Sequence, residues 1–96
     1  MIINASVQVV PLTRTKDPYP LIDEAIALIQ QSGLKYLVGA LETTIEGEYE
    51  PVQKLIREIE DFCYSQNEIQ FLIYKKIHLC GGQNILIEDK TGKFKK

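Results

Sequence analysis

One stretch, residues 32–51, constrains the fold of this chain more than any other part of the sequence. It opens with Gly33, where a preceding helix would end, and it closes on an acidic run and Pro51, a common start for a helix. Between them lie two short apolar runs, residues 34–38 and 43–45, separated by a glycine-alanine pair. The stretch therefore predicts the end of one helix, two strands joined by a turn, and the start of a second helix.

The rest of the chain places further elements on either side of this stretch. Alternating apolar residues over 3–9 predict a first strand, which Pro11 should end. Apolar residues at helical spacing over 21–29 predict the first helix, and a long strand is expected over 69–79. The buried stripe of the second helix is predicted to comprise Val52, Leu55, Ile56, Ile59, Phe62 and Cys63.

This order of elements predicts an α+β fold of the ferredoxin-like type, βαββαβ, with a short C-terminal tail. Its four-stranded antiparallel sheet carries both helices on one face, and the first and third strands are central neighbours. The tail, residues 83–96, is either a strand that runs into a turn or a short helix capped by Asn84. With 96 residues, 45% of them hydrophobic, we expect a single domain over 1–96.

The face of the sheet opposite the helices has a mixed composition. Its polar positions are predicted to be Asn4, Ser6, Gln8, Glu42, Thr44 and Glu46. Its apolar positions are predicted to be Val10, Leu37, Leu72 and Tyr74. Antiparallel sheets tolerate one solvated face, but apolar groups among polar ones are common where sheets pack together or hold a ligand. We favour association of the chain with itself through this face.

Charge and cysteine content exclude several classes of protein. Eleven Lys and Arg against 13 Asp and Glu give a net charge of -2, so the positive charge of a nucleic-acid binder is missing. Cys63 and Cys80 match no metal-ligand spacing, so we predict neither a metal site nor a cofactor. The first residues do not resemble a signal peptide, and no apolar run approaches the ~20 residues that span a bilayer. We expect a cytoplasmic protein with free thiols and no membrane partner.

The third strand carries the densest set of hydrogen-bonding side chains, and Glu46 is its leading candidate for ligand binding. Thr43 and Thr44 precede it, and Gly47 follows it, where the missing side chain would leave room for a ligand. A carboxylate beside hydroxyls is suited to accept hydrogen bonds from an aminopyrimidine. Neither a nucleophile nor a metal partner accompanies Glu46 and Glu48, so an enzymatic acid-base pair is not predicted.

Two other features of the sequence, a histidine and an arginine, could suggest catalysis, but neither predicts it. His78 is the only histidine, and a hydrogen-bonded strand histidine explains it better than a catalyst. Small phosphatases with this fold hold phosphate in the loop after the first strand, where this chain has Arg14. That use requires glycines to expose the backbone N–H groups, and residues 12–16 contain none.

Three segments, in this order and at this spacing, resemble the thiamine-binding protein family: VQVVP, SGLKY and TTIEGEYE. The resemblance implies a non-enzymatic, cytoplasmic protein that binds thiamine or its hydroxymethylpyrimidine half. It also implies a homotetramer built from dimers that associate through their sheets, or a homodimer. The ligand-binding residues carried over by motif are Ser6, Gln8, Tyr36, Thr43, Thr44 and Glu46. A lysine-rich tail departs from the clear C-terminal helix of relatives.

An alternative interpretation belongs to a different class of function. The chain would then be a regulatory or structural oligomerisation module, whose polar sheet face is only a subunit interface and which binds no vitamin. A thermal-shift experiment with thiamine separates the two, because a ligand that binds only the native state raises its stability.

Overall fold

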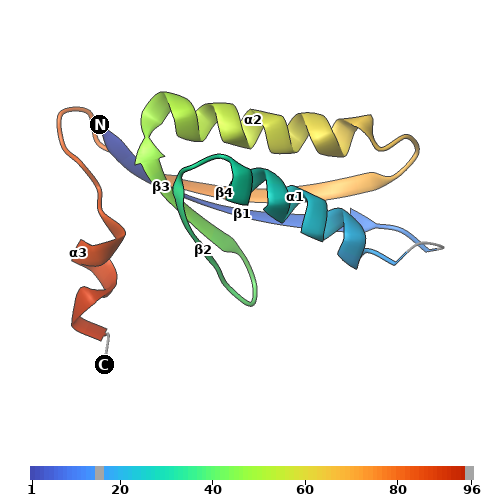
Figure 1. Ribbon diagram of the computed structural model, residues 1–96, viewed down its shortest axis with the longest axis horizontal. Coiled ribbons are helices and arrows are strands. Elements are labelled where there is room, and N and C mark those ends of the chain that lie inside the picture. The colour runs from blue at the N-terminus through green and yellow to red at the C-terminus, as the bar shows by residue number, and fades with distance from the viewer. Residues whose placement is uncertain (15–16, 95–96) are drawn as a thin grey trace.

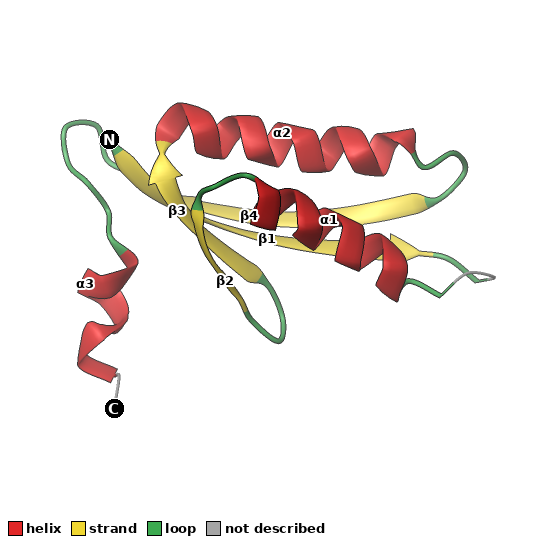
Figure 2. Cartoon of the chain, in the orientation of Figure 1, coloured by secondary structure: helices red, strands yellow, loops and turns green. Residues whose placement is uncertain are grey.

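A computed structural model describes residues 1–14 and 17–94 of the chain, and it confirms the ferredoxin-like arrangement. Figure 2 shows the longer helices packed beside a sheet and the short C-terminal helix standing apart from them. The elements are β1 (Ile2–Leu12), α1 (Tyr19–Gln31), β2 (Lys35–Val38), β3 (Thr43–Glu48), α2 (Tyr49–Ser65), β4 (Gln70–His78), α3 (Ile87–Thr91) and a 3₁₀ turn (Gly92–Phe94).

The four strands form one antiparallel sheet in the order β2-β3-β1-β4, so β1 and β3 are central neighbours as predicted. Figure 1 shows α1 and α2 on the same side of this sheet. We call the side that they cover the helix face and the other side the open face. Because side chains alternate along a strand, each residue of β1 belongs to one face or the other.

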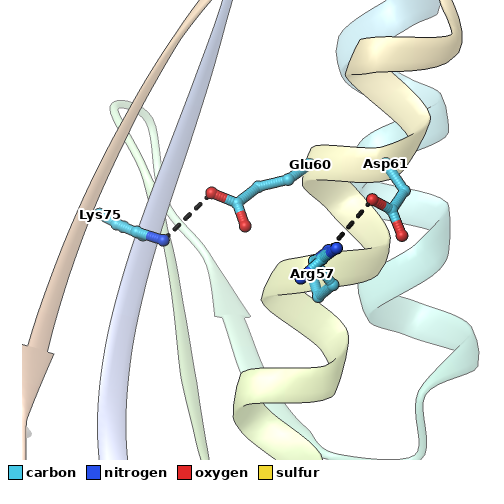
Figure 3. Close-up of polar contacts among 4 residues, drawn as sticks. All are labelled: Arg57, Glu60, Asp61 and Lys75. Atoms are coloured by element: carbon cyan, nitrogen blue, oxygen red, sulfur yellow. Dashed lines mark hydrogen bonds and ion pairs between the residues drawn. The ribbon is translucent and has the colours of Figure 1, made fainter.

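The core lies between the helix face and the two long helices. Ile3, Ala5 and Val7 of β1 are at most 5% exposed, and Ile45 of β3 is fully buried among them. The predicted stripe of α2 is confirmed, with Phe62 only partly buried at its edge. Lys75 of β4 also reaches α2, where its Nζ lies 3.1 Å from Oε2 of Glu60 (Figure 3).

Two predicted boundaries are wrong, and both involve proline. β1 does not end at Pro11 but continues to Leu12, and among the described strands it is paired only with β4 at this end. A strand with one unpaired edge tolerates a residue that has no N–H to donate. α2 begins at Tyr49 rather than Pro51. Proline is accepted there because the N–H groups of a first helical turn have no partner within the helix.

The tail forms a short helix, so the strand alternative is wrong. Asn84 does not cap it, because Leu86 precedes the first helical residue and the Asn84 side chain accepts a hydrogen bond from the Ile2 N–H at 2.8 Å. The Ile85 N–H donates to the Ile2 carbonyl at 2.9 Å. These bonds hold the tail beside the start of β1 (Figure 1). Lys95 and Lys96 of the predicted basic cluster lie outside the described residues.

Both cysteines are free, Cys63 buried and Cys80 exposed. Burial, with a smaller effect from the Glu60 charge, raises the pKa of the Cys63 thiol. His78 is hydrogen-bonded as expected, since its Nδ1 lies 2.9 Å from Nζ of Lys90. Within the described residues, none of the helices has the length and apolar character needed to cross a membrane.

Candidate ligand-binding site

The strand register divides the six predicted binding residues between the two faces of the sheet. Tyr36 is paired with Ile45, and Thr43 with Val7, so both lie on the helix face. The other four lie together on the open face: Ser6, Gln8, Thr44 and Glu46. A single site on one face therefore cannot contain all six side chains.

Three residues of the open face form a buried polar group, which we call the open-face cluster: Asn4, Ser6 and Glu46. They are only 4%, 8% and 9% exposed. Asn4 Oδ1, Ser6 Oγ and Glu46 Oε2 are buried and have no hydrogen-bond partner among residues 1–14 and 17–94. Lys35 Nζ lies 3.6 Å from Glu46 Oε2, which is an ion pair but too long for a hydrogen bond. Buried unpaired oxygens are uncommon and call for a donor such as water or a ligand.

Asn4 was missed as a candidate because alternation alone assigns it to a solvated face. The structure buries it through two contacts that are distant in sequence. Asn4 is paired with Glu46 across the sheet, and its Nδ2 donates to the Ile85 carbonyl of the tail at 3.0 Å. The sequence alone does not predict this burial of Asn4, because it depends on where the tail packs.

A cleft of about 530 Å³ opens on the helix side of the sheet. β1 pairs with β3 as far as Val7, whereas its pairing with β4 continues to Leu12. The β2–β3 hairpin diverges from β1 toward its turn (Figure 1). The cleft occupies this divergence, between residues 7–11 of β1, the start of α1 and the hairpin turn at 39–42.

The unpaired edge of β1 adds main-chain groups to this cleft. Residues 8–12 have no β3 partner among the described residues, although β4 pairs with them on the other side. Strand edges present N–H and C=O groups that are ready to bond. A ligand in the cleft can therefore use the backbone of β1 as well as side chains.

The walls of the cleft are mainly apolar, with a few polar side chains among them. Thr43 is only 5% exposed, and its hydroxyl makes no hydrogen bond to any other described residue. Asp23 of α1 and Glu42 of the hairpin turn also line the cleft. Clefts of this size, apolar with a few polar groups, are the usual sites for small ligands.

Two further predicted residues border the same region. Gln8 lines both the cleft and a shallower hollow on the other side of the hairpin turn. Thr44 lines the shallow hollow only. The structure thus brings Gln8, Thr43 and Thr44 together around the turn, while Ser6 and Glu46 belong to the open-face cluster and Tyr36 borders neither hollow.

Asp23 is a lining residue that the sequence interpretation missed, although a signal for it exists. Tyr19, Asp23 and Ile26 follow helical i, i+4, i+7 spacing and share one flank of α1 beside its buried stripe. The flank lines the cleft because the hairpin turn stands opposite it. No group of three or more metal-ligating side chains occurs in the described part of the chain.

Gly47 does not make room for a ligand as the sequence suggested. It is paired with Ile3, so the position faces the helices. A Cβ at this position would lie 2.9 Å from Leu34 Cδ2 and 3.2 Å from Val52 Cγ2. The space beside Gly47 is therefore used to pack the starts of β2 and α2 against the sheet.

Comparison with known proteins adds independent findings. A family model described as thiamine-binding protein matches residues 5–95. A UPF0045 protein of Clostridium perfringens is 26% identical over 92 residues, which cover 96% of each chain.

Two solved structures share the fold closely. A domain of unknown function, DUF77, from Bacillus cereus is 35% identical with a TM-score of 0.87, covering 98% of this chain and 90% of that one. A Thermotoga maritima protein whose proposed role is thiamine biosynthesis or salvage is 30% identical with a TM-score of 0.86. That match covers 99% of this chain and 100% of the other.

Proposed function

The chain belongs to the thiamine-binding protein family, and from this membership we propose that it binds thiamine, or the hydroxymethylpyrimidine half of thiamine, in the cleft beside β1. The observation that carries the proposal is the cleft itself. It has about 530 Å³ of space, mainly apolar walls, and the hydroxyl of Thr43, which makes no hydrogen bond within the described part of the chain. In this proposal the domain over residues 1–96 is a binding protein and not an enzyme.

The chemistry of thiamine matches the groups that line the cleft. Its two flat rings would contact apolar side chains such as Val9, Ile22 and Ile26. The pyrimidine ring nitrogens and amino group need hydrogen-bond partners, which the Thr43 hydroxyl and the unpaired edge of β1 supply. Asp23 provides negative charge for the positively charged thiazolium ring. Glu42 adds a second carboxylate, whose charge is partly offset by Lys76 at 3.2 Å.

A thermal-shift panel tests this function. Thiamine, its phosphates and hydroxymethylpyrimidine would be added separately to the protein. A ligand that binds only the native state adds roughly 2.7 kcal/mol of stability at a hundredfold excess over Kd. We expect a higher melting temperature with thiamine or the pyrimidine, and no shift with any of the compounds would contradict the proposal.

The open-face cluster is the second candidate position for the ligand. Its three buried oxygens accept no hydrogen bond from the described residues and are suited to an amino group. Glu46, which forms an ion pair with Lys35, would bring a charge to that contact. Glu46→Gln keeps the shape and removes the charge, so it should weaken binding by about 1.5–3 kcal/mol if the ligand sits there. If the ligand sits in the cleft, calorimetry should give Glu46→Gln the affinity of wild type. Glu48→Gln is the matched control, because Glu48 is exposed and outside the cluster.

The open face also supports self-association, as a homotetramer of dimers or a homodimer. Leu37, Leu72 and Tyr74 are 65%, 45% and 56% exposed there. Large apolar side chains that share an uncovered face favour a second sheet as partner. Light scattering at micromolar concentration measures the assembly directly, and a monomer would contradict it. Assembly without any effect of thiamine would favour the oligomerisation module.

A further inference from the structure

The cleft is lined by carboxylate side chains and by the start of α1, whose first N–H groups are absent or already bonded. We propose that the cleft selects the unphosphorylated, positively charged form of a thiamine-like ligand over its phosphate esters. This inference rests on the proposed function. It assigns Asp23 and Glu42 as residues that set specificity.

The described residues that line the cleft contribute carboxylates and no cationic side chain. Asp23 has no ion-pair partner among the described residues. Glu42 Oε1 lies 3.2 Å from Lys76 Nζ, but Lys76 lines only the shallow hollow, and its side chain is 75% exposed. A phosphate ester, with about 1.5–2 negative charges at neutral pH, would therefore face like charge in the cleft.

The start of α1 also borders the cleft, at Pro18 and Tyr19. Helix N-termini commonly bind phosphate, because their first N–H groups are unpaired and carry partial positive charge. Here those donors are absent or occupied. Pro20 has no N–H, and the Tyr19 N–H donates to Asp17 Oδ1 at 3.1 Å. The Leu21 and Ile22 N–H groups both donate to the Pro18 carbonyl at 3.2 Å.

The carboxylates of the cleft and the occupied N–H groups at the start of α1 both disfavour a phosphate group. The end of the helix that would attract an anion is closed by two prolines and the Asp17 carboxylate, and the facing walls carry Asp23 and Glu42. A thiazolium ring gains from this field, a phosphate loses, and the uncharged pyrimidine half is unaffected. Comparing thiamine with its phosphate esters therefore tests the effect of charge, and the uncharged pyrimidine half tests the fit of shape.

Isothermal calorimetry with thiamine, thiamine monophosphate, thiamine diphosphate and hydroxymethylpyrimidine measures this selectivity. We expect thiamine to bind about tenfold more tightly than its monophosphate at low salt, with the diphosphate weaker still. The difference should shrink as ionic strength rises, because exposed charges are screened. Hydroxymethylpyrimidine binding should change little with salt.

Asp23→Asn removes one carboxylate from the cleft with little change of shape. It should narrow the ratio of thiamine to monophosphate affinity by about two- to fivefold, and it should change hydroxymethylpyrimidine affinity less than thiamine affinity. Glu42→Gln should act in the same direction. Glu24→Gln is the matched control, because Glu24 follows Asp23 on α1 but does not line the cleft. Its ratio of thiamine affinity to monophosphate affinity should equal that of wild type.

Monophosphate binding as tight as thiamine binding in wild type would overturn this inference and leave the proposed function intact. An unchanged ratio in both Asp23→Asn and Glu42→Gln would equally overturn it. Absence of binding by thiamine and by hydroxymethylpyrimidine would overturn the proposed function and this inference together. If Asp23→Asn fails to fold, the salt dependence of wild-type binding and the Glu42→Gln variant still test whether the cleft disfavours phosphate esters.

Discussion

The two halves of β1 have different surroundings, although their sequences are similarly apolar. Residues 2–7 pair with β3, and most of them also pair with β4, so this half is closed on both sides. Residues 8–12 pair with β4 and have no β3 partner in the described part of the chain. The closed half forms the core with the helices, whereas the open half borders the cleft. Space for a ligand thus arises where strand pairing stops.

Because one half of β1 belongs to the core and the other borders the cleft, substitutions near each half should have different effects. Ile3, Ala5 and Val7 are buried, and the helices above them contribute most of the remaining core. Val9 and Val10 in the open half are only partly buried. Substitutions in the core beneath residues 2–7 of β1 should therefore change the free energy of unfolding. Substitutions around residues 8–12 should change the affinity for the ligand.

The largest effect is expected in the core beneath the closed half. Leu55→Ala and Ile56→Ala should each lower the free energy of unfolding by about 2–5 kcal/mol, because both side chains are 2% exposed and would leave cavities. Denaturant melts measure the loss. Tyr64→Ala on the same helix is the control, since Tyr64 is 94% exposed and should change stability by less than about 0.5 kcal/mol. Losses below about 1 kcal/mol for both core variants would contradict this assignment of the buried face.

Gly47→Ala should have the next largest effect, again on stability alone. The added methyl group would press on Leu34 and Val52, and overpacking costs about 1–3 kcal/mol. Leu34 is only partly buried, so its side chain can move and the cost should fall near the lower limit. Adding Leu34→Ala should relieve the overlap with Leu34 and make Gly47→Ala less costly than it is alone. Thiamine affinity that fell while stability stayed constant would show that Gly47 belongs to a ligand site after all.

Thr43 and Thr44 provide a matched pair on opposite faces of β3. Thr43→Val keeps the shape and removes the hydroxyl that lines the cleft, so thiamine affinity should fall by about 0.5–1.5 kcal/mol. Thr44→Val should change affinity less, because Thr44 lines only the shallow hollow. Calorimetry on both variants measures the difference. A greater loss for Thr44→Val would place the ligand on the open face.

The smallest effect concerns Cys63, whose pKa is raised by burial and then by the Glu60 charge. The folded thiol holds its proton more tightly than the unfolded thiol, whose ordinary pKa is 9.0. Its contribution to stability is therefore complete below pH 9.0 and is lost as the pH rises through the folded value. Unfolding measured across this range should show a steeper loss for wild type than for Cys63→Ala. Equal slopes would contradict the raised pKa.

Much of the fold follows from local patterns in the sequence. Alternation identifies the helix face of β1, and helical spacing identifies the buried stripe of α2. The error at Pro11 has a physical cause: proline is tolerated in a strand that lacks a neighbour on one side, and this end of β1 has no β3 partner among the described residues. The length over which two distant strands stay paired cannot be read from either strand alone.

The same limit applies to the candidate site. Gln8 and Thr43 were predicted, and they border the cleft. Asp23 and Glu42 were not predicted as ligand groups, because they meet only after the hairpin turn and α1 pack on either side of β1. Thr43 and Thr44 stand together in the motif, yet a strand sends neighbouring side chains to opposite faces. A motif therefore identifies the right strand more readily than the right side chains.

The most direct test of the central claim is amide chemical-shift mapping by NMR during a thiamine titration. A ligand in the cleft should shift the signals of residues 8–10, the hairpin turn at 39–43, and the flank of α1 that includes Asp23. The amides of Asn4, Ser6 and Glu46 should move little in comparison. Shifts confined to those three residues and their open-face neighbours, or no shifts at saturating thiamine, would contradict the account.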